Sequence, residues 1–217
     1  MTYRINLTGL PGSGKGSIAR AIREKLDIPY FSTGDILREA ERQGTPLGRA
    51  YAEHCTGGGF IPDSVIIPIV QERLTGLEQY LLEGFPRTVP QAQAFQGFSR
   101  FTHVIELYLS PDAEQLARQR IDARWVCSGK ECKDGLYGLT RLPPEDHLCL
   151  DCGSALIKRD DDKPEKVSTR FAMYHRETEK VIPFYQPLGI VHRVDASQHF
   201  TKEAEDVLRA LGINGQA

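Results

Sequence analysis

The sequence lacks a strong net charge. Its 27 lysines and arginines nearly balance 29 aspartates and glutamates, so the formal net charge is −2 at pH 7. Nonspecific nucleic-acid binders usually carry a strongly basic face, and the interleaved aromatic and basic residues that bind single strands are missing as well. We therefore expect no nucleic-acid partner, although local basic clusters can still bind small anions.

Long apolar runs are also absent. No window of 18 apolar residues occurs, whereas a membrane-spanning helix needs about 20. The first residues, "MTYRINLTGLPG", lack the basic start and the long apolar run of a signal peptide. Heptad repeats and an obvious apolar surface helix are missing too. From these absences we expect a cytoplasmic protein that has no membrane partner and is a monomer.

The chain is long enough, and has enough hydrophobic residues, to form a substantial core. Its 217 residues suit one domain with insertions, or two small domains. Hydrophobic residues make up 40% of the sequence, so the whole molecule does not depend on a metal for its stability, unlike a domain of about 40 residues.

A glycine-rich segment near the start predicts a phosphate site. An apolar, β-branched stretch precedes "GLPGSGK" (residues 9–15), and apolar residues at helical spacing follow it. Successive N–H groups and the helix start would point at phosphate oxygens, and Lys15 would add a positive charge. Gly16 follows Lys15 and the hydroxyl comes at Ser17, so the strict P-loop pattern is not met. The alternative is a glycine-rich turn that binds nothing.

Further strand candidates indicate an α/β fold. Apolar stretches at residues 80–85, 102–109 and 190–196 are separated by helix-like segments. A strand, loop and helix at the start imply a parallel sheet with crossover helices. Ligands in such folds bind at the carboxyl ends of the strands.

The loop "GLPGSGKGS" resembles that of the adenylate kinases, which typically reads G-x-P-G-x-G-K-G-[ST]. Five further segments look like family segments and occur in the family's order: "STGDILR" (32–38), "GFIPDSVI" (59–66), "EGFPRTVPQA" (83–92), "RDDD" (159–162) and "STRFAMYH" (168–175). The resemblance implies a P-loop NTPase-type parallel sheet flanked by helices. It also implies reversible phosphoryl transfer, ATP + AMP = 2 ADP, with Mg²⁺, which maintains the adenine nucleotide balance.

The resemblance assigns roles to individual residues. The residues expected to bind ATP are Gly12, Ser13, Gly14, Lys15, Gly16, Ser17, Arg120, Arg124 and Gln198. The residues expected to bind AMP are Thr33, Arg38, Gly84, Arg87, Gln91, Arg159 and Arg170. The residues expected to be catalytic are Lys15, Arg87, Arg124, Arg159 and Arg170.

Physical chemistry gives an independent reason to expect the arginines to converge. Two nucleotides held end to end bring several negative charges together, and a planar guanidinium can bind phosphate oxygens in pairs. Four arginines that are distant in sequence fall in the matched segments, Arg38, Arg87, Arg159 and Arg170, and Arg120 and Arg124 lie between two of these segments. Each alone would be interpreted as a surface ion pair. The "RDDD" run is either a solvated acidic stretch or a segment in which Asp161 or a neighbour steers lid closure.

Two positions depart from the family pattern. Glu83 stands where the family usually has aspartate before "GFPR"; the longer carboxylate could still hold a magnesium-bound water. Gln198 lies where the family often has lysine, and we expect its backbone carbonyl to meet adenine.

The resemblance also divides the chain into parts. Residues 1–31, 60–123 and 160–217 would form the core P-loop domain. Residues 32–59 would form the AMP flap, with a hydroxyl of "STGD" capping a helix and the glycines at 57–59 as a hinge. Residues 124–159 would form the lid, in its long form. Closure of both parts would exclude water from ATP.

Four cysteines in the lid predict a structural zinc site at Cys127, Cys132, Cys149 and Cys152. Their C-x₄-C and C-x₂-C spacings lie within those that tetrahedral zinc tolerates, and paired cysteines in a reducing compartment bind metal more often than they form disulfides. Residues 127–156 are rich in Gly and Pro and poor in large apolar residues, so a metal would fix their shape. The alternatives are a vestigial first pair, disulfides, or His147 in place of one sulfur. Iron or cobalt would also suit four thiolates.

Three rival functions remain open on the sequence alone. A UMP/CMP-type kinase usually has a short lid, and the long lid of this chain argues against it. A nucleic-acid-associated zinc ribbon with an ATP-driven switch disagrees with the acidic balance. A plain P-loop hydrolase would release phosphate without AMP.

Overall fold

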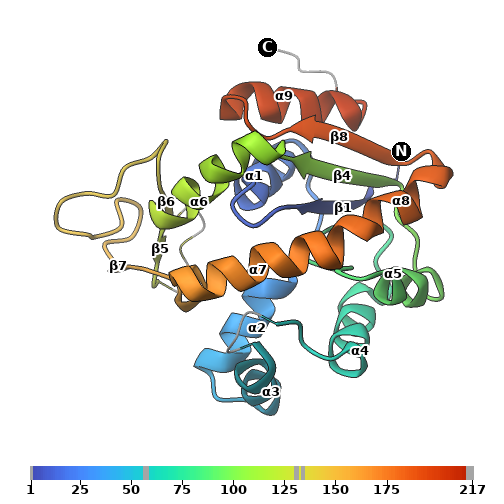
Figure 1. Cartoon of the computed structure of the whole chain (residues 1–217), viewed down its shortest axis with the longest axis horizontal. Helices are drawn as coiled ribbons and strands as arrows, with labels where there is room; N and C mark the ends of the chain where they lie inside the picture. Colours follow the sequence, from blue (N-terminus) through green and yellow to red (C-terminus); the bar gives the residue numbers. More distant parts are fainter. Residues whose placement is uncertain (1, 56–58, 130–131, 133–134, 214–217) are drawn as a thin grey trace.

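A computed structural model describes residues 2–55, 59–129, 132 and 135–213. These residues form a central sheet of five parallel strands in the order β2-β3-β1-β4-β8 (Figure 1). The strands are β1 (Arg4–Gly9), β2 (Tyr30–Ser32), β3 (Tyr80–Glu83), β4 (His103–Tyr108) and β8 (Val191–Asp195). The predicted parallel α/β fold is therefore confirmed, and β2 is the strand of this sheet that was not predicted from the sequence.

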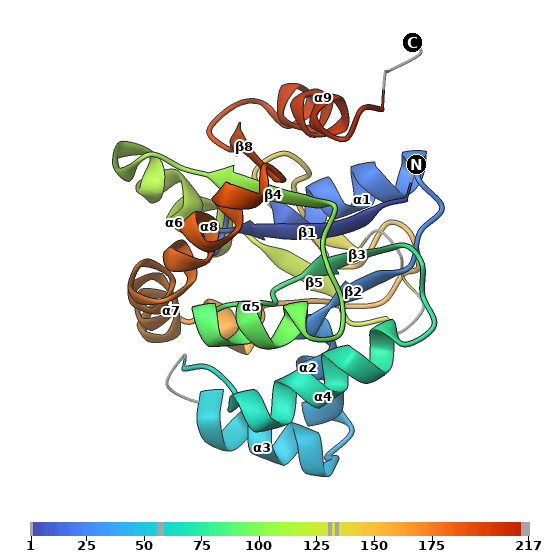
Figure 2. The same cartoon turned by 90° about the vertical axis from the view of Figure 1, so that its right-hand side faces the viewer.

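Side chains along β1 alternate between the two faces of the sheet, so the two faces pack against different layers of helices. Ile5 and Leu7 point to one face, where they pack against α1 (Lys15–Lys25) and α9 (Phe200–Ala210). Val207 of α9 is fully buried in the same cluster. Figure 2 shows α1 and α9 together on one side of the sheet, so the first and last helices of the described chain share one core.

The opposite face carries two further clusters. Tyr80 and Leu82 of β3 pack with Phe95 and Phe101, whose rings stack with centroids 4.2 Å apart. Leu10 packs with the helices that flank the lid. The helices of this side are α4 (Asp63–Leu74), α5 (Val89–Gln96), α6 (Glu114–Asp122), α7 (Pro164–Arg176) and α8 (Val181–Tyr185). Short 3₁₀ turns occur at Pro111–Ala113, Asp160–Asp162, Thr178–Lys180 and Gln186–Leu188.

The segment expected to form the AMP flap contains α2 (Thr33–Arg42) and α3 (Pro46–Cys55), which lie below the sheet in Figure 2. The Asp35 N–H donates to Ser32 Oγ at 3.2 Å, so the predicted hydroxyl cap of this helix is confirmed. Two residues of the expected hinge at 57–59, Gly57 and Gly58, lie outside the described residues.

The lid carries a small antiparallel sheet in the order β6-β5-β7. Its strands are β5 (Trp125–Cys127), β6 (Leu136–Tyr137) and β7 (Leu156–Ile157). Its buried cluster contains only Tyr137, Cys149 and Leu156 among the residues described, while Leu142 remains 74% exposed. Figure 1 shows this segment projecting from the ends of α6 and α7. No helix in the described parts of the chain is long and apolar enough to span a membrane.

Candidate active site

The carboxyl ends of the parallel strands border a cavity of about 310 Å³. This volume is at the lower end of the range for small-molecule sites, about 300–1,000 Å³. Most residues of the predicted site line the cavity, including Gly12, Gly14, Lys15, Gly16, Ser17, Arg38, Gly84, Arg87, Arg120, Arg124, Arg159 and Arg170. The structure therefore brings together residues that are up to 158 positions apart in the sequence, from Gly12 to Arg170.

The glycine-rich loop is held tightly between β1 and α6. Gly12 has φ 84°, and a Cβ at this position would lie 2.4 Å from the carbonyl oxygen of Ala117. Only glycine fits there without moving the backbone. The close approach leaves the loop's N–H groups and the start of α1 next to the cavity, as a phosphate site requires.

Lys15 folds back over this loop. Its Nζ donates to the carbonyl oxygens of Gly9 at 2.8 Å and Leu10 at 2.9 Å. Burial of the ammonium group lowers its pKa to about 8; the nearby arginines Arg170 and Arg87 lower it further, whereas Glu83 opposes the shift. The lysine therefore remains mostly cationic at neutral pH, in a setting where a phosphate would stabilise its charge.

Two residues of the predicted ATP set do not line the cavity. Ser13 is fully buried, and the side chain of Gln198 turns back to donate to the Asp195 carbonyl at 3.1 Å. Arg120 Nη1 donates to the Ala196 carbonyl at 2.8 Å and so ties α6 to the loop that precedes α9. The side chain of Gln198 thus makes local hydrogen bonds, and the contact of its backbone carbonyl with adenine stays a prediction.

A second, smaller cavity of about 70 Å³ lies beside the first and is bordered by residues of α2 and α3. The predicted residues that border it are Thr33, Arg38, Gly84, Arg87, Gln91 and Arg170. Gly84 has φ 82°, and a Cβ there would lie 2.6 Å from Thr33 Oγ1. The flap and the end of β3 can therefore approach this closely only because residue 84 is glycine.

Hydrogen bonds fix the orientation of Gln91 in this smaller cavity. Its Oε1 accepts from the Arg87 backbone N–H and its Nε2 donates to Asp63 Oδ1, both at 2.7 Å. Arg87 Nε in turn donates to the Gly84 carbonyl at 2.8 Å. Three residues predicted to bind AMP, Gly84, Arg87 and Gln91, are thereby linked to one another, and Gln91 links them to the start of α4.

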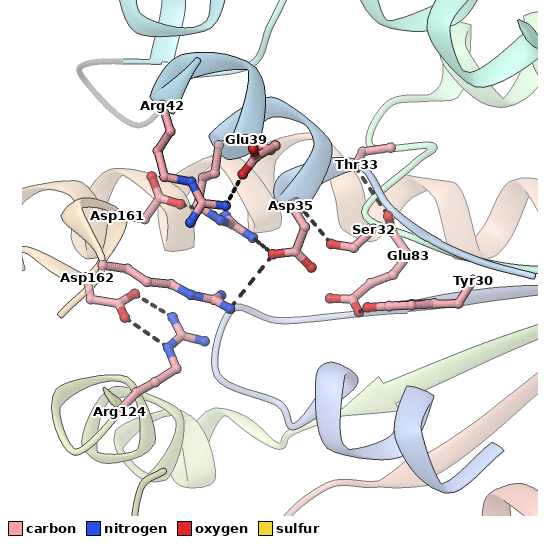
Figure 3. Close-up of polar contacts among 12 residues, drawn as sticks. Tyr30, Ser32, Thr33, Asp35, Glu39, Arg42, Glu83, Arg124, Asp161 and Asp162 are labelled. Carbon is pink, nitrogen blue, oxygen red and sulfur yellow. Dashed lines mark hydrogen bonds and ion pairs between the residues drawn. The ribbon is translucent and has the colours of Figure 1, made fainter. Parts of the chain in front are cut away.

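Carboxylates contact several of the converging arginines (Figure 3). Arg38 pairs with Asp35 at 2.6 Å and with Asp161 at 2.8 Å. Burial opposes the charge of Arg38, but these two carboxylates outweigh it and raise the pKa of the guanidinium. Arg159 borders the larger cavity and Asp161 the smaller one, so this part of the "RDDD" run lies at the candidate site, whereas Asp160 is exposed and pairs with Lys163 and Lys166.

Arginines also pair with aspartates on the side of the site that lies next to the lid. Arg124 forms two hydrogen bonds to Asp162, one of them 2.9 Å from Nε to Oδ2. Arg170 Nη1 donates to the Asp161 carbonyl at 2.8 Å. Burial, together with repulsion from Arg38 and Arg124, lowers the pKa of Arg159 to about 10. Like charges gathered in this way indicate a site built for a highly charged anion.

Two positioning contacts were not foreseen from the sequence. The Tyr30 hydroxyl donates to Glu83 Oε2 at 2.7 Å, and Figure 3 shows the phenol reaching across to the carboxylate. Asn6 Nδ2 donates to the Phe85 carbonyl at 2.8 Å, which holds the turn after β3. A tyrosine and an asparagine in apolar stretches look like ordinary strand residues, so no sequence signal marked either one.

The four lid cysteines form one cluster. Their Sγ atoms all lie within 4.8 Å of one another, with Cys127–Cys152 at 3.4 Å and Cys132–Cys149 at 3.6 Å. A disulfide would need about 2.05 Å, whereas zinc–sulfur bonds of about 2.3 Å in a tetrahedron place sulfurs about 3.8 Å apart. The widened first pair therefore reaches the second, and the donor set fits a tetrahedral metal.

His147 is not a member of this cluster. Its ring packs against Trp125 with centroids 4.4 Å apart, and its Nδ1 lies 3.2 Å from the Glu145 carbonyl. The Tyr137 hydroxyl approaches Cys149 Sγ at 3.6 Å and accepts from the Leu150 N–H at 2.8 Å. An outer layer of hydrogen bonds thus surrounds the thiols.

Comparison with known proteins agrees with this geometry. Residues 7–190 match the family model described as adenylate kinase. The chain is 37% identical over 221 residues to an adenylate kinase of Moorella thermoacetica, covering 98% of this chain and 100% of the relative. It is 39% identical over 215 residues to one of Archaeoglobus fulgidus, covering 94% and 96%. It is 36% identical over 219 residues to one of Thermotoga neapolitana, covering 98% of both. The chain therefore belongs to the adenylate kinase family.

Proposed function

We propose that this enzyme, a nucleoside monophosphate kinase, catalyses reversible phosphoryl transfer, ATP + AMP = 2 ADP, with Mg²⁺ entering as part of the ATP substrate. The observation that carries the proposal is the gathering of all six predicted arginines and Lys15 around one cavity at the end of the phosphate loop. In-line phosphoryl transfer needs little covalent chemistry from the protein. It needs two phosphate-bearing substrates held end to end, neutralised charge and exclusion of water.

On the ATP side, the loop from Gly12 to Ser17 holds the phosphates through N–H groups and the start of α1. Lys15 exchanges its carbonyl partners for phosphate oxygens, since a charged acceptor makes the stronger hydrogen bond. Arg120 and Arg124 reach the phosphates from the base of the lid, and the backbone at Gln198 meets the adenine ring.

On the AMP side, Thr33, Gly84 and Gln91 contact the base, while Arg38 and Arg87 bind the phosphate. Arg159 and Arg170 lie between the two nucleotides and neutralise charge on the transferred group. Together with Lys15, Arg87 and Arg124 they form the catalytic set. Glu83, held by Tyr30, is placed to bind a water of the magnesium ion that accompanies ATP.

The lid cysteines hold a structural zinc ion. Four protein thiolates fill a tetrahedral sphere and leave no position for catalysis. The small apolar cluster of the lid supports this role, because so few buried side chains do not fix the shape of the segment. Zinc in turn would make the lid a rigid body.

The parts of the chain divide as the resemblance implies: residues 1–31, 60–123 and 160–217 form the core, 32–59 the AMP flap and 124–159 the lid. Closure of flap and lid excludes water from the reaction, as in other lidded enzymes; the adenylate kinase lid is itself the usual example of such motion. We further propose a cytoplasmic monomer without nucleic-acid or membrane partners. The near-neutral charge and the absence of long apolar runs in the sequence support this view.

The decisive experiment measures ADP formation with ATP and each of AMP, CMP, UMP and GMP. We expect rapid turnover with AMP, and little with the other three. Phosphate release from ATP alone should be negligible. Equal rates with CMP or UMP, or steady phosphate release without AMP, would overturn the proposal.

A pair of variants tests the arginine cluster directly. Arg124→Lys should lower kcat by at least about 100-fold, because a lysine cannot replace the paired hydrogen bonds of a guanidinium at a transferring phosphoryl group. Arg118→Lys is the matched control, since Arg118 lies nearby on α6 but lines neither cavity. Equal kcat values for the two variants would remove Arg124 from the catalytic set.

A further inference from the structure

Glu203 is a buried carboxyl group to which the proposed mechanism gives no role. It lies in the first turn of α9 and is only 2% exposed. Its carboxylate faces the phosphate loop: a Cβ built on Gly14 would lie 3.4 Å from its Oε1 and 3.8 Å from its Oε2. Glu203 also borders the main cavity. An acidic group therefore sits directly behind the loop that is expected to bind a triphosphate.

The carboxyl group is not compensated as a buried charge normally is. Its Oε1 is fully buried and has no hydrogen-bond partner within the described part of the chain. The two cations whose charges act on Glu203 donate elsewhere: Lys15 Nζ to the carbonyls of Gly9 and Leu10, and Arg120 Nη1 to that of Ala196. A buried carboxylate in this condition is costly, whereas the neutral acid is much less so.

The charges around Glu203 come from every element packed against it. Lys15 on α1 and Arg120 on α6 favour the carboxylate, and Asp195 at the end of β8 disfavours it. On α9 itself, Lys202 and Asp206 pair with each other. Burial is the largest influence and raises the pKa of Glu203 to about 7. The group is therefore balanced between its two protonation states near neutral pH.

We propose that Glu203 couples ATP binding to proton uptake, because its carboxylate takes a proton from solvent when the triphosphate occupies the loop in front of Gly14. The proposal rests on the proposed ATP site. The physical reason is repulsion: MgATP brings net negative charge close to the carboxylate, and a nearby like charge favours the neutral form. The product is a neutral carboxylic acid, and the proton comes from the buffer.

The coupling makes the Kd for ATP depend on pH. Above pH 7 Glu203 is mostly a carboxylate in the free enzyme. Binding of ATP is then accompanied either by protonation of Glu203 or by repulsion between the carboxylate and the triphosphate. The Kd for ATP therefore rises with pH above 7, by up to about tenfold per pH unit until the pKa of the complex is reached. Below about pH 6 the carboxyl group is already neutral, so its effect on Kd vanishes.

Titration calorimetry with MgATP, without AMP, tests the proposal. Heats measured at pH 7.5 in two buffers of different ionisation enthalpy give the number of protons taken up per ATP. The proteins compared are the wild type, Glu203→Gln and Glu205→Gln. The last is the matched control, since Glu205 is an exposed glutamate on the same helix. Lys15 and the phosphates also exchange protons, but they do so in all three proteins.

We expect Glu203→Gln to take up about half a proton less per ATP than the wild type and the control. Equal proton uptake in all three proteins overturns the coupling. If Glu203→Gln does not fold, Glu203→Leu, which removes the buried polar group altogether, replaces it with the same expected result. Failure of the proposed ATP site looks different, because then MgATP produces no binding heat even with the wild type.

Discussion

Tyr30 and Glu83 lie on adjacent parallel strands, and their 2.7 Å hydrogen bond shows how a single residue accommodates a departure from the family pattern. Glutamate is one methylene longer than aspartate and has more rotamers to lose on binding. The Tyr30 hydroxyl restricts that freedom and directs the carboxylate along the edge of the cavity. Tyr30 and Glu83 both border the cavity, and we expect the phenol to act by positioning the Glu83 carboxylate.

Tyr30→Phe should lower kcat by about tenfold and raise the Mg²⁺ concentration needed for half-maximal rate. A hydrogen bond to a charged group contributes about 1.5–3 kcal/mol, of which a part is lost at the transition state. Steady-state rates across a Mg²⁺ series check this, with KM for AMP expected to stay unchanged. Tyr3→Phe is the control, because Tyr3 lines neither cavity. An unaltered Mg²⁺ dependence in Tyr30→Phe would show that Glu83 needs no such support.

The raised pKa of Glu203 also predicts a pH-dependent stability. Its ordinary pKa of 4.5 rises to about 7 in the folded protein, so the folded state binds the extra proton between these values. The contribution of Glu203 to stability is thus present below pH 4.5 and is lost as pH rises through 7. We expect Glu203→Gln to be more stable than the wild type at pH 8, and the gap to widen by about 2 kcal/mol from pH 5.

Urea unfolding at pH 5, 6, 7 and 8 measures this difference. Glu205→Gln should follow the wild type at every pH, because Glu205 is exposed and substitutions at such surface positions change stability little. A constant gap between Glu203→Gln and the wild type across the series would mean that Glu203 does not titrate near neutrality.

The arginines of the site could be predicted from the sequence, whereas other residues around the cavity, such as Glu203, could not. Arg38, Arg87 and Arg170 sit inside motifs whose order and spacing identify them. Glu203 carries no such mark: it lies 189 positions from Gly14, on an amphipathic helix where a glutamate is normally assigned to solvent. Only the packing of α9 against α1 reveals that this turn faces the phosphate loop.

At the scale of elements, we expect the lid to depend on its cysteines more than on its small apolar cluster. Leu142 and Leu150 are 74% and 70% exposed, and the strands of the lid are two or three residues long. Strands this short give almost no periodic signal, so the sequence predicted the lid as a segment but not its sheet. The same limit explains the missed β2, which has only three residues.

Replacing one thiol should loosen the lid while leaving the core folded. We expect Cys132→Ser to lose bound zinc, to be cleaved by protease within residues 125–157 far faster than the wild type, and to lose most of its kcat. Zinc binding in small peptides is worth on the order of 10–16 kcal/mol, which the apolar cluster of the lid does not replace. Elemental analysis, limited proteolysis and the coupled assay measure the three effects.

Metal removal supplies the control for this variant. Wild-type protein stripped by a chelator should behave as Cys132→Ser does, and added zinc should restore the wild type but not the variant. A fully active, protease-resistant protein without metal would refute the structural role of the site.

At the scale of the whole molecule, the chain enters and leaves the lid on neighbouring strands. Val126 of β5 pairs with Ile157 of β7 in antiparallel register. A short Gly-Ser linker can therefore join residues 126 and 157 without disturbing α6 or α7. Such a deletion keeps Arg124 and Arg159 but removes the cover over the cavity to which Leu136–Arg141 contribute.

The lidless variant should fold and yet fail as a kinase. We expect kcat for ADP formation to fall by at least about 1,000-fold, because water enters and the phosphoryl group is no longer enclosed. Circular dichroism and thermal unfolding should show an intact core beside the coupled assay. Full transfer activity in this variant would show that the reaction proceeds without closure of the lid.

The packing of α1 against α9 has a consequence for synthesis on the ribosome. The phosphate loop emerges early, but Val207 and Leu211, which bury Ile5 and Ile18, emerge roughly 190 residues afterwards. At about 5–20 residues per second, the nascent chain spends about ten seconds or more with that apolar surface uncovered. This order of elements therefore delays completion of that core until α9 has been synthesised.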